Sequence, residues 1–202
     1  WNHLVSFKFN KICKSCINKE SYLKYLSLAC VPTPNTIYQN IKKLTPGHYL
    51  RIENGHVTKL NYWSLTDRQS WEGDITEAKE KLTELIEDSI RLRFRSDVPL
   101  GIFLSGGIDS SAIVAYASKL GRDINTFTIN FSDKKSNDSK YATKISRQFS
   151  TSHKEVNFDS NSFILELDSL INSLDEPVSD SAIIPSYLLS KIARKNGIKV
   201  LL

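Results

Sequence analysis

Apolar and polar residues follow different patterns in the two parts of this chain. After residue 73, short apolar runs alternate with longer stretches whose apolar residues recur at helical spacing. The pattern predicts strands at 99–104, 125–131, 153–158 and 198–202, and helices at 75–93, 110–120, 138–149, 161–173 and 183–196. Strands alternating with helices are typical of a parallel sheet with helices on both faces, and we expect this α/β fold.

The first 63 residues are rich in aromatic residues, lysine and turn signals. A short helix is expected at 21–30. Residues 49–53 alternate as a strand and 56–60 return as its partner, because Asn54-Gly55 suits the two positive-φ positions of a tight hairpin turn. This pattern is typical of the end of a β-containing unit rather than of a whole domain.

We expect three parts: the end of one domain at 1–63, a linker at 64–73, and part of a second domain at 74–202. The second domain opens with the helix at 75–93. Asp74 suits its N-cap position, and Glu77 three residues later completes a capping box.

Composition is that of an ordinary globular protein, with 40% hydrophobic and 24% charged residues. No apolar stretch approaches the roughly 18 residues of a membrane span, and no signal peptide is evident, so we predict a cytoplasmic protein without a membrane partner. The net charge of +5 comes from scattered lysines and arginines, so we expect no nucleic-acid partner. Cys13 and Cys16 could form half of a zinc site or a redox pair, but no second pair follows, and ordinary thiols are expected.

One loop carries most of the chemical information: Ser105-Gly106-Gly107-Ile108-Asp109-Ser110-Ser111, between a predicted strand and a predicted helix. The first turn of a helix has unpaired N–H groups and a partial positive charge, which attract anions. The two glycines let phosphate oxygens approach the backbone, and the three hydroxyls can donate to them. Asp109 repels phosphate by itself, so its presence indicates a Mg²⁺ ion bridging it to the phosphates.

The loop differs from other phosphate-binding motifs. It lacks the lysine of the Walker A sequence and the third glycine of the dinucleotide fingerprint. The alternative is a tight strand-to-helix turn capped by Ser110, but such a turn needs neither Asp109 nor so many hydroxyls.

The loop resembles the signature of the ATP-pyrophosphatase (PP-loop) superfamily, whose members cleave ATP between its α- and β-phosphates. Its surroundings are similar to the glutamine-hydrolysing asparagine synthetases. Four stretches carry that resemblance: 97–104, 175–190, 31–38 and 44–50, of which the last two resemble the end of the family's glutaminase domain. The resemblance implies an adenine nucleotide alpha-hydrolase-like fold, preceded by the end of an N-terminal-nucleophile glutaminase.

The resemblance also implies residue roles. Leu104 offers backbone groups to the nucleotide, and Ile129 packs near the adenine. Residues Ser105 to Ser111 bind pyrophosphate, with Asp109 on magnesium as the catalytic residue. Asp180 lies in a loop that faces the acyl substrate.

The implied reaction is ATP-dependent amide synthesis in two steps. A carboxylate, by default that of aspartate, forms an acyl-adenylate with release of pyrophosphate, and ammonia from glutamine then forms the amide. Relatives that amidate sugar acids or close β-lactam rings remain alternatives, as does an RNA-modifying PP-loop enzyme. The implied partners are small molecules, and a homodimer stays open.

Two departures from the family pattern matter. Neither the glutaminase nucleophile, an N-terminal cysteine, nor the acidic second loop of the synthetase domain occurs in this sequence. The chain also lacks methionine and ends on an apolar run. We therefore expect a piece of a longer polypeptide that is inactive alone.

Overall fold

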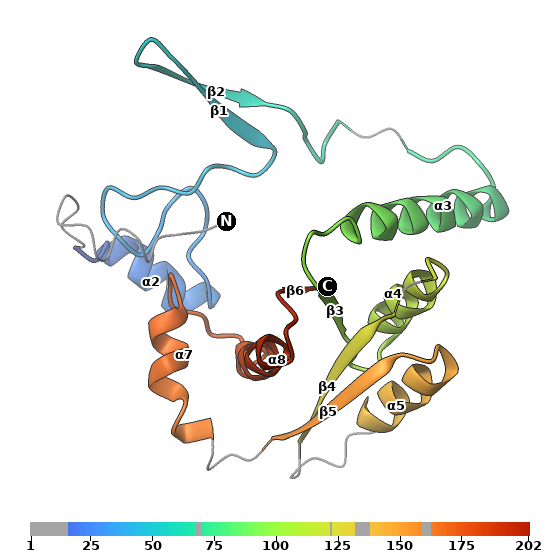
Figure 1. The fold of residues 1–202 in the computed structure, drawn as a ribbon. Coiled ribbons are helices and arrows are strands. Elements are labelled where there is room, and N and C mark those ends of the chain that lie inside the picture. Colours follow the sequence, from blue (N-terminus) through green and yellow to red (C-terminus); the bar gives the residue numbers. More distant parts are fainter. Residues whose placement is uncertain (1–15, 68–69, 122, 132–137, 159–162) are drawn as a thin grey trace. The chain divides into compact units, whose positions relative to one another are not determined.

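The computed structural model describes residues 16–67, 70–121, 123–131, 138–158 and 163–202. The chain forms two compact units, each described separately below (Figure 1). The first unit contains Trp1–Glu72 and Ile171–Ser181, and the second contains Gly73–Leu170 and Ala182–Leu202. Residues 171–181 thus pack with the first unit, although the sequence-based division groups them with the second part.

The second unit is built on a parallel sheet with strand order β5-β4-β3-β6. Its strands are β3 (Leu100–Phe103), β4 (Asn125–Phe131), β5 (Ser152–Phe158) and β6 (Val200–Leu201). Its helices are α3 (Ile75–Arg93), α4 (Ile108–Ser118), α5 (Asp138–Gln148) and α8 (Ile183–Lys195), while α7 (Leu167–Ser173) runs from this unit into the first. The expected α/β fold is therefore confirmed.

Apolar side chains pack on both faces of the sheet. One core joins Ile102 and Leu104 to residues of α3, α4 and α5, including Ile90 and Val114. The opposite core joins Phe127 to residues of and after α8. Figure 1 accordingly shows α8 on one side of the strands and α4 and α5 on the other.

Within the described part of residues 1–72, the first unit contains one helix and one hairpin, and the end of α7 also belongs to this unit. Helix α2 (Lys19–Leu28) covers most of the predicted helix at 21–30. Strands β1 (His48–Glu53) and β2 (His56–Asn61) pair in antiparallel register. Asn54 and Gly55 have φ values of 50° and 78°, so the turn predicted from that dipeptide is confirmed.

The predicted start of one helix is confirmed, and another predicted helix is wrong. Helix α3 begins after Asp74, and its capping box with Glu77 is complete. The single helix predicted at 161–173 is interrupted by a turn at 165–166. There the Glu166 carboxylate accepts hydrogen bonds from Lys191 and Tyr187 of α8. Helical periodicity does not reveal such tertiary contacts. Residues 161 and 162 lie outside the described residues, as does Cys13.

Candidate functional site

The site lies at the carboxyl edge of the parallel sheet. Strands β3, β4 and β5 follow one another outward on one side, and β6 then pairs on the other side of β3. The direction in which successive strands are added to the sheet therefore reverses at β3. In open α/β sheets, ligands bind outside the carboxyl ends of the strands at such a reversal.

A pocket of about 280 Å³ opens at this edge. Its walls come from the ends of β3 and β4 and from the first turns of α5 and α8. The lining residues are Phe103, Leu104, Ser105, Phe127 to Phe131, Asp138, Ser139, Ala182, Pro185, Ser186 and Leu189. Ile129 belongs to this set and also packs on the Phe127 core, and its predicted contact with an adenine stays a prediction.

The loop predicted to bind phosphate follows directly from the pocket wall. Leu104 and Ser105 line the pocket, and α4 begins at Ile108, with Gly107 as N-cap and no side chain capping it. The first N–H groups of a helix have no partner within the helix. Within the described residues, the N–H groups of Ile108, Asp109 and Ser110 donate to no protein acceptor. Ile108 is 89% exposed, and its apolar side chain has no hydrogen-bonding group, so it can bind an anion only through its backbone N–H.

Two serine hydroxyls hold the loop in shape. Ser105 Oγ lies 3.0 Å from Ser110 Oγ, and the Ser105 N–H donates to the same Ser110 oxygen at 3.3 Å. The Ser110 hydroxyl also donates to the Gly107 carbonyl at 3.3 Å. The hydroxyl of Ser111 has no hydrogen-bond partner in the described part of the chain, so it is also available to a ligand.

Gly106 is the tightest point of the loop. Its φ is +78°, and a Cβ atom there would lie 2.5 Å from the carbonyl oxygen of Asp138 and 2.9 Å from Cβ of Tyr141. Both neighbours belong to the first turn of α5. Only glycine lets the loop pass this close with a positive φ.

The backbone N–H and carbonyl of Leu104 both form hydrogen bonds with residues of β4. Its N–H donates to the Phe127 carbonyl at 2.9 Å, and its own carbonyl accepts a hydrogen bond from the buried hydroxyl of Thr128. The N–H is thus already used, and only the carbonyl retains a free lone pair for a nucleotide. Thr128 was missed by sequence reasoning, because its partner lies 24 residues away.

Asp109 is exposed in the first turn of α4. Its carboxylate makes no hydrogen bond or ion pair with any other described residue, so both oxygens are accessible. No group of three metal-ligating side chains occurs in the described part of the chain. A metal ion at Asp109 would therefore take most of its ligands from substrate and water.

Asp180 is not grouped with the other predicted site residues. It belongs to the first unit, whereas Leu104 to Ser111 and Ile129 belong to the second. Its assignment to the acyl substrate stays a prediction. The start of α8, by contrast, was missed as a pocket wall, although Ala182 to Ser186 lie within the stretch 175–190 that carries the family resemblance.

The titratable residues with shifted pKa values lie outside the pocket. Burial lowers the pKa of His153 below its ordinary value, while Glu155 acts in the opposite direction. His153 lies near the amino end of β5, and its Nδ1 is 2.9 Å from the Thr126 hydroxyl of β4. Its buried Nε2 has no hydrogen-bond partner among the described residues. A hydrogen bond from Lys191 lowers the pKa of Glu166, and that contact raises the pKa of Lys191.

Comparison with protein families separates the chain into two ranges. The model of the asparagine synthase family matches residues 81–202, more than half of the chain. The chain belongs to the asparagine synthase family. A second model, the glutamine amidotransferase domain, matches residues 4–63.

Individual relatives agree with this assignment. The glutamine-hydrolysing asparagine synthetase 1 of Bacillus subtilis is 31% identical over 181 residues, covering 89% of this chain and 28% of that protein. A putative asparagine synthetase 2 of Methanocaldococcus jannaschii is 33% identical over 189 residues, covering 90% of this chain and 36% of that protein. The chain thus spans about a third of the length of these relatives.

Among solved structures, an NMN synthetase from Francisella tularensis is similar with a TM-score of 0.42 and 19% identity, over 64% of this chain and 54% of that chain. A similarity of this size indicates nothing about substrates. Among the described helices, none is both long and apolar enough to span a membrane.

Proposed function

We propose that the chain is the nucleotide-binding part of a ligase that uses ATP to convert a carboxylic acid into an amide. One observation carries this proposal: Leu104 and Ser105 line an apolar pocket and also begin a loop with unpaired N–H groups. Membership in the asparagine synthase family supports the same function.

The pocket suits an adenine base. Its volume of about 280 Å³ is just below the roughly 300–1,000 Å³ of most small-molecule sites, so it holds a base rather than a whole nucleotide. Ile129, Phe103 and Phe127 provide apolar contacts for the ring. The phosphates would then lie outside the pocket, on the exposed N–H and hydroxyl groups from Ser105 to Ser111.

The loop can stabilise the charge that develops in the first chemical step. A carboxylate oxygen of the acceptor attacks the α-phosphorus, and the bond to the oxygen bridging the α- and β-phosphates breaks. Pyrophosphate leaves with that electron pair, and its negative charge faces the α4 N-terminus. Such preorganised donors are worth about 100- to 1,000-fold in rate for a single group.

The second step forms the amide. Ammonia attacks the acyl carbon, AMP leaves with the electron pair of the acyl–oxygen bond, and the nitrogen loses a proton. We propose that glutamine supplies the ammonia, because residues 4–63 match a glutamine amidotransferase domain. That match also favours amide formation over an RNA-modifying reaction, which has no use for glutamine.

The residues of the loop fit a magnesium ion shared with the phosphates. Mg²⁺ is usually held by one or two carboxylates together with substrate phosphates and water. Asp109 supplies one accessible carboxylate at the phosphate end of the site. When bound, the ion neutralises phosphate charge, and the role of Asp109 is to hold it there.

The acceptor acid is proposed to be aspartate, because the relatives reported above are named asparagine synthetases, with a sugar acid as the alternative. Asp180 is proposed to face this acid. The chain alone is proposed to be inactive, because it spans about a third of its relatives.

The test measures pyrophosphate release by the full-length protein with ATP, magnesium and glutamine across a panel of carboxylic acids. We expect one acid to stimulate release, and Asp109→Ala to reduce it by about 100-fold or more. The control is Asp123→Ala, which removes another exposed carboxylate of the second unit and should leave the rate unchanged. If no acid stimulates release, the proposed function is wrong.

A further inference from the structure

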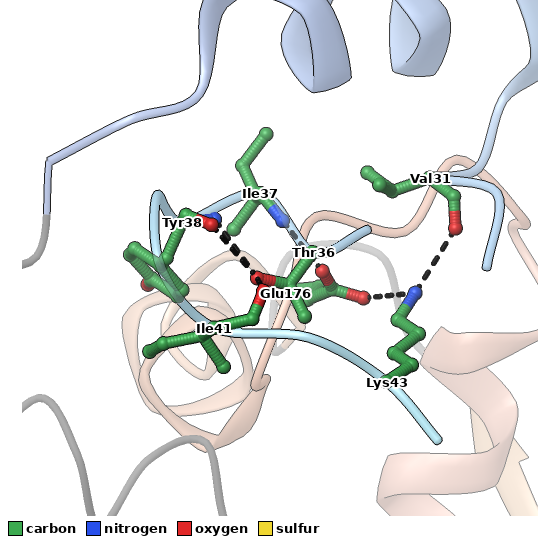
Figure 2. A network of polar contacts seen from close by, with 7 residues as sticks. All are labelled: Val31, Thr36, Ile37, Tyr38, Ile41, Lys43 and Glu176. Carbon is green, nitrogen blue, oxygen red and sulfur yellow. Dashed lines mark hydrogen bonds and ion pairs between the residues drawn. The ribbon is translucent and has the colours of Figure 1, made fainter. Parts of the chain in front are cut away.

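Carboxylates join distant segments within both units. In the first unit, Glu176 accepts a hydrogen bond from the Ile37 N–H at 2.7 Å and forms an ion pair with Lys43 (Figure 2). In the second unit, Glu155 on β5 accepts a hydrogen bond from Ser139 Oγ, in the first turn of α5, at 2.7 Å. The contact in the second unit belongs to the candidate site, because Ser139 lines the pocket.

The first turn of α5 packs directly on the loop Ser105–Ser111. A Cβ atom on Gly106 would lie 2.5 Å from the Asp138 carbonyl oxygen and 3.0 Å from the Ala142 nitrogen, so no side chain separates the two backbones. The position of this turn therefore determines how much room the loop has.

The first turn of α5 needs contacts of its own to stay in place. Helix ends open more easily than helix centres, because the first N–H groups have no partner within the helix. Further along α5, the fully buried Ala142 packs in the core with Ile102 and Leu104. The hydrogen bond from Ser139 to Glu155 fixes the helix one turn earlier, next to Gly106.

The sheet gives Glu155 a fixed position beside the start of the loop. Glu155 stands opposite Thr128 in the parallel register of β4 and β5. Thr128 in turn donates a hydrogen bond to the carbonyl of Leu104, the residue before the loop. The loop is thus held at two points: β4 holds its start, and β5 holds, through Ser139, the helix turn on which Gly106 packs.

We propose that Ser139 and Glu155 are positioning residues that keep the loop Ser105–Ser111 in the shape that binds the phosphates of the nucleotide. The proposal rests on the function proposed above. Without this hydrogen bond, the first turn of α5 is free to move away from Gly106, and the N–H groups of the loop are no longer held in one arrangement. Residues in such networks change binding by roughly 2- to 30-fold.

The test uses the full-length protein and two ligands. One is the α,β-methylene analogue of ATP with magnesium, which cannot be cleaved at the proposed bond, and the other is adenosine, which has no phosphate. Ser139→Ala removes the donor and Glu155→Ala removes the acceptor, whereas Ser139→Thr keeps a hydroxyl and Glu155→Gln keeps an acceptor oxygen. The matched control is Glu80→Ala, which removes an exposed carboxylate of α3 in the same unit.

We expect Ser139→Ala and Glu155→Ala each to weaken binding of the ATP analogue by about 2- to 30-fold, and the double variant to be no weaker than the weaker single variant. Adenosine should bind as tightly as before, because the apolar walls from β3, β4 and α8 remain. Ser139→Thr and Glu155→Gln should retain most of the affinity for the analogue, and Glu80→Ala all of it.

A second measurement needs no ligand. Hydrogen exchange of the amide N–H groups at 142 and 143, which close the first turn of α5, should speed up in both alanine variants. All measurements are made below the unfolding transition of each variant, so that a loss of stability alone leaves affinity unchanged.

Four outcomes contradict the proposal in different ways. If both alanine variants bind the analogue as the parent does, the pair is only a local structural contact. If Ser139→Ala alone weakens binding, Ser139 acts by direct contact with the ligand and not through Glu155. If adenosine loses as much affinity as the analogue, the pair shapes the pocket and not the loop. If the parent itself does not bind the analogue, the proposed function fails and the positioning proposal fails with it.

Discussion

Gly106 carries the strongest steric constraint in the candidate site. Its positive φ costs another residue about 1–2 kcal/mol, and a Cβ would also meet the carbonyl of Asp138 at 2.5 Å. Gly106→Ala should therefore lower the free energy of unfolding of the second unit by more than about 2 kcal/mol, measured by urea denaturation.

A matched control exists in the same unit. Gly121 has a φ of +65° but open space where its Cβ would lie. Gly121→Ala should cost only the backbone strain. Equal losses for the two variants would show that the loop moves away from α5 without penalty.

The place of the Ser105–Ser111 loop between a strand and a helix was predictable from the sequence, because it depends on local pattern. The roles of its residues toward a ligand stay predictions. Thr128 was not predictable, since its hydroxyl acts on Leu104 across two strands. The same holds for Asp180, whose grouping with the first unit depends on tertiary contacts.

Thr128 adds a side-chain hydrogen bond between β4 and the residue that follows β3. The buried Leu104 carbonyl loses this hydrogen bond in Thr128→Val, and an unsatisfied buried acceptor costs about 1–3 kcal/mol. We expect that loss in urea denaturation, together with weaker binding of the ATP analogue. Thr128→Ser keeps the hydroxyl and should retain most of the stability. A Thr128→Val variant as stable as the parent would contradict this role.

We expect His153 in strand β5 to make the stability of the protein depend on pH. Burial lowers the pKa of His153 in the folded protein, below the value of about 6.5 expected when unfolded. Below that pH the unfolded state binds more protons, so the free energy of unfolding should fall as the pH drops from 7 to 5. Urea denaturation should show a smaller fall for His153→Gln.

The control for this prediction is His56→Gln, because His56 is exposed on the hairpin. The free energy of unfolding of this variant should change with pH as that of the parent does. An unchanged slope in His153→Gln would show that His153 does not produce the effect.

Helices and strands were predictable where local signals agree. Helix α3 has both a capping box and regular apolar spacing, and its predicted bounds of 75–93 match the structure. The helix predicted at 161–173 failed because Glu166 turns toward Lys191 and Tyr187 of α8. Periodicity describes one element at a time and carries no information about such a partner.

The division of the whole chain into two units also depends on contacts that the sequence pattern does not reveal. The composition change near residue 64 was visible in the sequence, and the family matches fall on either side of it, at 4–63 and 81–202. The packing of 171–181 with the first unit was not visible, because it depends on contacts such as Glu176 with Ile37, 139 positions apart.

The most direct test of ATP-dependent carboxylate activation follows an oxygen atom. The stimulating acid is labelled with ¹⁸O in its carboxylate, the full-length protein is given ATP, magnesium and glutamine, and the AMP is analysed by ³¹P NMR. If the carboxylate attacks the α-phosphorus at the Ser105–Ser111 site, one ¹⁸O atom appears in the phosphate of each AMP. Unlabelled AMP, or ADP and phosphate as the products, would contradict this mechanism.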